Sequence, residues 1–69
     1  MPVVVRFEDP DLFYNDSSPA HMILERNGIQ RGEYRVLSEM PPIIILPQLD
    51  DAAIGELKSL GQVEVEVHN

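Results

Sequence analysis

The feature that most constrains the fold is the order of patterns in the second half of the chain, residues 33–69. A strand-like stretch at 33–39 is followed by a turn at Met40-Pro41-Pro42 and then by an unbroken apolar run at 43–46. Such a run is typical of a central strand that is buried on both of its faces. The run leads into a helix and then a final strand. Four elements are therefore expected within 37 residues.

The helix in this half carries several independent signals. Asp50 stands at the N-cap position, and Leu49 and Ile54 have the spacing of a hydrophobic staple. Gly61 follows the last apolar position, where a helix often ends in a left-handed residue. The residues expected to form the buried stripe are Ala53, Ile54, Leu57 and Leu60. The final strand alternates Val63, Val65 and Val67 with Glu64, Glu66 and His68, which predicts one buried and one solvent-exposed face.

The first half of the chain predicts one strand and one short helix. Residues 2–8 alternate, with Val3, Val5 and Phe7 on one face. Residues 9–18 are expected to be a loop. A helix at 19–27 begins after Ser18, a good N-cap, and ends before Gly28.

The resulting order is strand, helix, strand, strand, helix, strand in a single domain, residues 1–69. Right-handed crossovers place both helices on one face of a four-stranded antiparallel sheet. The predicted class is therefore α+β, with the ferredoxin-like split βαβ arrangement (βαββαβ).

The net charge of the chain indicates which classes of partner it can bind. Twelve acidic residues against five basic ones give a formal net charge of −7, which disfavours nucleic-acid binding. An acidic surface instead suits a basic patch on another protein. No apolar stretch approaches the length of a membrane span, so no membrane partner is expected. The chain has no cysteine and shows no signal-peptide pattern, and we therefore expect a cytoplasmic protein.

The sequence contains no recognisable catalytic or metal-binding set. No nucleophile motif surrounds any serine, no His or Cys pair has zinc spacing, and no glycine-rich phosphate loop is present. His21 is expected to be a solvent-exposed helix residue. We accordingly predict a protein that is not an enzyme and needs no cofactor and no metal.

The predicted first loop contains two of the four aromatic residues, Phe13 and Tyr14. Aromatic side chains are enriched at binding hot spots, so these two are candidate partner-binding residues. The alternative is that they fold back as a lid over a small core.

The second half of the chain resembles the subtilisin propeptide and proteinase-inhibitor family. The resemblance lies in Tyr34-Arg35-Val36, in the apolar run 43–47, in the capped helix 49–60 and in the segment 61–67. It implies a sheet that docks on a subtilisin-like serine protease, as an inhibitor or a folding assistant. Glu33 and Glu39 would then cap helices of the protease. The last residues would lie in its cleft like a substrate; these are Val65, Glu66, Val67, His68 and Asn69.

Two further functions remain open from the sequence. The first is a small acidic phage- or plasmid-type protein that antagonises a host protein by covering its basic patch. The second is a small-ligand regulatory module. Pairing through the free edges of the sheet would also allow a homodimer.

Overall fold

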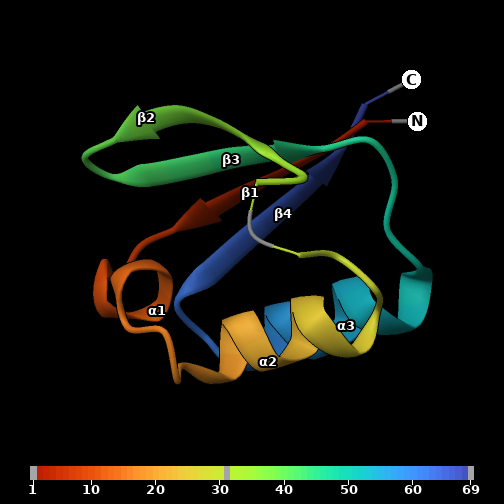
Figure 1. The fold of residues 1–69 in the computed structure, drawn as a ribbon, viewed down its shortest axis with the longest axis horizontal. Helices are drawn as coiled ribbons and strands as arrows, with labels where there is room; N and C mark the ends of the chain where they lie inside the picture. Colours follow the sequence, from red (N-terminus) through yellow and green to blue (C-terminus); the bar gives the residue numbers. More distant parts are fainter. Residues whose placement is uncertain (1, 31, 69) are drawn as a thin grey trace.

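The chain forms a four-stranded antiparallel sheet with helices packed against one face (Figure 1). The structure is a computed structural model and describes residues 2–30 and 32–68. Its elements are, in order, β1 (Val3–Phe7), α1 (Asp11–Tyr14), α2 (Pro19–Arg26), β2 (Arg35–Glu39), β3 (Pro42–Leu46), α3 (Asp51–Ser59) and β4 (Val63–Val67). The predicted α+β class and the four-stranded antiparallel sheet are confirmed. The described residues contain three helices, one more than expected.

The strands lie in the order β2-β3-β1-β4, so β3 and β1 are central and β2 and β4 are the edges. Val5 is opposite Ile44 on one side and Val65 on the other. Because directly opposed residues point to the same face, this register sets the whole inner face of the sheet. It brings the branched apolar side chains of three strands together over the helices.

The core lies between the sheet and the helices α2 and α3. Its fully buried side chains include Phe7, Ile44, Leu46 and Leu57. The apolar run in β3 is not buried on both faces, as the sequence suggested. Ile44 and Leu46 are buried, whereas the alternate residues Ile43 and Ile45 are only half-buried. That expectation was wrong because both longer helices cover the same face of the sheet (Figure 1).

The short helix α1 lies in the segment that was expected to be a loop. Its turn is closed by the N–H groups of Phe13 and Tyr14, which both donate to the carbonyl of Pro10 at 3.0 and 2.9 Å. The side chain of Asp9 accepts from the N–H of Asp11 at 3.1 Å. A single turn is too short to leave a hydrophobic period in the sequence, so the pattern gave no signal for it.

The ends of α2 follow the predicted capping chemistry. The hydroxyl oxygen of Ser18 accepts from the N–H of His21 at 3.3 Å. At the other end Gly28 has a φ of 78°, and the N–H of Ile29 donates to the carbonyl of Leu24 at 2.9 Å. This is the Schellman motif, in which a left-handed glycine lets the chain leave the helix.

The edge strand β2 does not alternate regularly between the two faces of the sheet. Val36 is opposite Ile44, but Ser38 is opposite Ile43, so two steps along β2 match a single step along β3. The irregularity is a β-bulge, which leaves one extra residue, Leu37, in the strand. Val36 and Ser38 therefore face opposite sides of the sheet, whereas a strand without a bulge would place them on the same side.

Candidate functional site

The two histidines occupy different environments, one buried and one exposed. His21 is only 4% exposed, and its Nε2 donates to the carbonyl of Phe13. The expectation of a solvent-exposed His21 was wrong, because α1 folds back over this part of α2. His68 lies at the end of β4, where its Nε2 is 3.9 Å from a carboxylate oxygen of Glu66. Within residues 2–30 and 32–68, no three His, Cys, Asp or Glu side chains are placed to hold a metal ion.

The open face of the sheet, the side away from the helices, carries a short apolar strip. We define the apolar strip as Val4, Ile43 and Ile45, all of which are half-buried. Val4 is directly opposite Ile45 in the register of β1 with β3, and Ile43 lies two residues from Ile45 on the same face. Three branched apolar side chains therefore meet on a face that no helix covers in the part of the chain that the structure describes.

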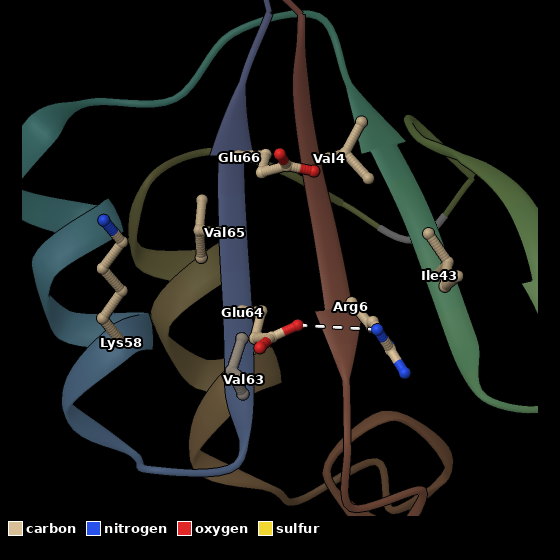
Figure 2. A pocket seen from close by; sticks show the side chains of 8 residues that line it. All are labelled: Val4, Arg6, Ile43, Lys58, Val63, Glu64, Val65 and Glu66. Carbon is tan, nitrogen blue, oxygen red and sulfur yellow. Dashed lines mark ion pairs between the residues drawn. The ribbon is translucent and has the colours of Figure 1, made fainter.

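Charged side chains flank the apolar strip on the same face. Glu64 is opposite Arg6, and Glu66 is opposite Val4. Arg6 forms an ion pair with Glu64 at 3.6 Å, with both side chains more than half exposed (Figure 2). Arg35, which is opposite Ile45, lies at the other end of this row. The acidic end of the face is therefore on β4 and a basic residue is on β2.

A groove of about 700 Å³ joins the open face to the free edge of β4. Figure 2 shows β1 along one side of β4 and Lys58 of α3 beyond the other side. The groove is lined by Val4, Arg6, Ile43, Lys58, Val63, Glu64, Val65 and Glu66. It is a shallow, open feature, and its walls combine apolar surface with side chains of both charges.

The C-terminal candidate residues are held within the sheet. Val65 is opposite Val5 and Val67 is opposite Val3, with Glu66 between them on the open face. The N–H of His68 donates to the carbonyl of Pro2 at 2.8 Å, which extends the pairing by one more residue. These residues would have to leave β1 before they could lie in a cleft. Asn69 lies outside the described residues.

Glu33 and Glu39 are not brought together with Glu66. Both belong to the β2 side of the sheet, which is the edge opposite β4. Glu33 precedes β2 and its carboxylate accepts from the N–H of Gln30 at 3.2 Å. Glu39 is at the far end of β2, opposite Pro42. The two residues therefore stand at separate ends of one edge strand.

Phe13 and Tyr14 have different surroundings although they are adjacent in α1. The ring of Phe13 is half-buried, with its centroid 5.4 Å from that of Phe7 and 5.8 Å from that of His21. It therefore closes one end of the core, as the lid alternative proposed. Tyr14 is 54% exposed, and its ring packs edge-on against that of Phe13 at 5.1 Å.

The apolar strip was missed as a candidate site, although the sequence contained part of the signal. Alternation in the first strand already placed Val4 and Arg6 on the face away from the core. The other two residues of the strip, Ile43 and Ile45, could not be assigned to a face. They belong to a run of four consecutive apolar residues, which does not indicate which ones the helices cover. Lys58 lines the groove because α3 packs beside β4. No local sequence pattern predicts which helix packs beside which strand.

Comparison with protein-family models, with curated proteins and with solved structures finds no match for this chain. Of the helices in residues 2–30 and 32–68, none has the length and apolar character that a membrane span requires.

Proposed function

We propose that this protein is a non-enzymatic protein-binding module, and that the open face of its sheet is the binding surface. The observation that carries the proposal is the apolar strip of Val4, Ile43 and Ile45, which lies half-exposed and flanked by charge. Apolar patches rimmed by polar residues mark interaction surfaces on small proteins. Binding there would bury side chains that the fold itself leaves uncovered.

We further propose that the arrangement is the ferredoxin-like split βαβ. The order β2-β3-β1-β4 supports it, because β1 and β2 are separated by β3, and β3 and β4 are separated by β1. Each of these pairs is connected through one of the longer helices, α2 or α3. The helix α1 is then an additional turn in the first crossover.

The partner class that we put forward first is a subtilisin-like serine protease, which the protein would inhibit or help to fold. The support is the resemblance of the second half of the chain, together with a sheet face that is free and carries carboxylates. Glu64 and Glu66 stand beside the apolar strip, and carboxylates stabilise the positive N-termini of helices. They are better placed for that role than Glu33 and Glu39. Because Val65 and Val67 pair with β1, we propose inhibition through the sheet face and not through a tail.

An assay of peptide hydrolysis by a subtilisin tests this proposal. Micromolar protein is expected to slow hydrolysis, and Ile45→Lys is expected to weaken the inhibition by about tenfold, because it places a charge in the apolar strip. Met22→Lys is the matched control, since Met22 is an apolar residue that is 57% exposed on α2, in the helical layer. A rate of hydrolysis that stays unchanged at micromolar protein would show that the protein does not inhibit the subtilisin.

The net charge of −7 favours a second candidate partner, a basic patch on another protein. This is the antagonist function that the composition first indicated. Complex formation of that kind weakens as salt rises, because exposed charges are screened beyond about 10 Å at 0.1 M salt. Binding to a purified basic partner that is equally tight at low and high salt would contradict it.

A further inference from the structure

The main chain of β4 has its free hydrogen-bonding groups on the groove side. The N–H of Glu8 donates to the carbonyl of Gln62, and the N–H of His68 donates to the carbonyl of Pro2, each at 2.8 Å. In an antiparallel pair such bonded positions alternate with non-bonded ones. Even-numbered residues of β4 therefore point their N–H and C=O groups toward β1. Odd-numbered residues point theirs away from it.

The outward-pointing residues are Val63, Val65 and Val67. β4 is the last strand of the sheet, so their main-chain groups point away from every other strand of the described chain. Val63 and Val65 also line the groove. A row of three such residues is a template onto which an extended segment can add as a further strand. The groove of about 700 Å³ along this edge supplies the room.

The side chains around the groove indicate which residue types a bound segment would need at each position. Residues opposite Glu64 and Glu66 would share the open face with two carboxylates, one of which already has Arg6 at 3.6 Å. Cross-strand pairs of opposite charge are favourable and pairs of like charge are not. The residue opposite Val65 would instead face the helix side, beside an apolar side chain and near Lys58. The matching segment alternates basic and apolar residues.

A second copy of this chain does not meet that requirement. Antiparallel pairing of two β4 strands about Val65 would place Glu64 of each copy opposite Glu66 of the other, and so gather four carboxylates on one face. The other edge is protected differently. β2 contains the bulge at Leu37, and the hydroxyl of Tyr14 is bonded to its last residue. Bulges and covered edges are devices that prevent strand addition.

We propose that β4 accepts an extended segment of the partner protein as a fifth strand, and that this segment alternates lysine or arginine with apolar residues. The inference rests on the proposed protein-binding function and specifies how the partner is held. The fifth strand would pair with Val63, Val65 and Val67, while its basic side chains would reach Glu64 and Glu66. Main-chain bonds would supply affinity and the two carboxylates would supply selectivity.

A synthetic peptide in which lysine and valine alternate is the probe. Amide exchange in the nitrogen-labelled full chain is expected to slow at least about tenfold at Val63, Val65 and Val67 on binding. The amides of Glu64 and Glu66, already bonded to β1, serve as internal controls and are expected not to change. A peptide that alternates glutamate with valine is expected to bind at least about tenfold more weakly, and Glu66→Lys is expected to reduce this preference.

Methylation of alternate peptide nitrogens tests the pairing without any change in the protein. In antiparallel addition, methylation of the valine nitrogens removes bonds to β4 and is expected to weaken binding about tenfold for each bond, whereas methylation of the lysine nitrogens leaves the pairing intact. The reverse result indicates parallel addition and equally supports the proposal. Equal binding by the two methylated peptides overturns it.

Failure of strand addition is distinguishable from failure of the proposed function. If the lysine–valine peptide shifts the methyl signals of Val4, Ile43 and Ile45 but leaves the exchange of the outer amides unchanged, the open face binds and strand addition is wrong. If the peptide changes neither, strand addition is likewise wrong. The hydrolysis assay with Ile45→Lys then tests binding by the open face independently, because weaker inhibition by this variant supports that face without strand addition.

Discussion

The hydroxyl of Tyr14 donates a hydrogen bond of 2.7 Å to the main-chain carbonyl of Glu39, which lies 25 residues later in the chain. The bond ties α1 to the end of β2, next to the cis peptide between Met40 and Pro41. Tyr14 is more than half exposed, yet it makes one of the contacts that hold the β2–β3 hairpin to the rest of the molecule.

Removal of this hydroxyl tests how much the hydrogen bond contributes to the free energy of unfolding. We expect Tyr14→Phe to lower the free energy of unfolding by about 1 kcal/mol, because the carbonyl of Glu39 loses its donor while the ring keeps its contact with Phe13. Urea denaturation measures the change. Met22→Leu, at a residue of similar exposure in α2, is the control and is expected to have little effect. Equal stability of Tyr14→Phe and the parent protein would contradict the prediction.

Replacement of the two histidines separates a buried polar contact from an exposed one. His21 is 4% exposed and its ring nitrogen donates to the carbonyl of Phe13, so His21→Leu leaves that carbonyl without its donor. We expect a loss of about 1–3 kcal/mol in the free energy of unfolding. His68→Leu is the matched control, and its effect should stay within about 0.5 kcal/mol because the side chain is half exposed. A loss for His21→Leu of no more than about 0.5 kcal/mol, the limit expected for His68→Leu, would show that the buried contact is not stabilising.

The elements with a regular pattern could be predicted from the sequence, and those without one could not. The strand around Val5 alternates with a period of two, the helix after Ser18 has a capping residue at each end, and both form where expected. The turn of α1 after Pro10 is too short to produce a hydrophobic period, and so periodicity did not predict it although the side chain of Asp9 bonds to its first N–H group. The bulge at Leu37 is likewise set by pairing with β3 and by the turn that follows.

The candidate site was less predictable than the fold, because it depends on which face the helices cover. Sequence alone could not decide between one-sided and two-sided burial of Ile43 and Ile45. Glu66, which the sequence predicts as a partner-binding residue, lines the groove, and its role stays a prediction. Lys58, which also lines the groove, belongs to α3, and only the packing of α3 beside β4 brings the two residues into one groove.

Two glycines are expected to respond oppositely to the same substitution. Gly55 lies in α3 with nothing within 4 Å of an added Cβ, so Gly55→Ala should raise the free energy of unfolding by about 0.5–1 kcal/mol. Gly61 has a φ of 87°, which is unfavourable for alanine, and Gly61→Ala should lower it by about 1 kcal/mol. Thermal unfolding of the two variants side by side measures the difference. Changes of the same sign would contradict the assigned backbone conformations.

Arg6 competes with the proposed fifth strand for Glu64, since the two side chains already pair at 3.6 Å on the open face. We expect Arg6→Gln to tighten binding of the lysine–valine peptide about threefold, because a carboxylate becomes available to a basic residue of the peptide. The free energy of unfolding should change by less than about 0.5 kcal/mol, since both partners of the ion pair are exposed.

Arg35→Gln is the matched control for this effect. It removes the same charge from the same face, but Arg35 lies in β2, opposite Ile45 and at the edge away from β4. Both variants change the net charge equally, so long-range attraction of a cationic peptide should rise in each. Only the loss of Arg6 releases Glu64. Calorimetric titration that gives the same affinity for the two variants would show that Arg6 does not compete locally.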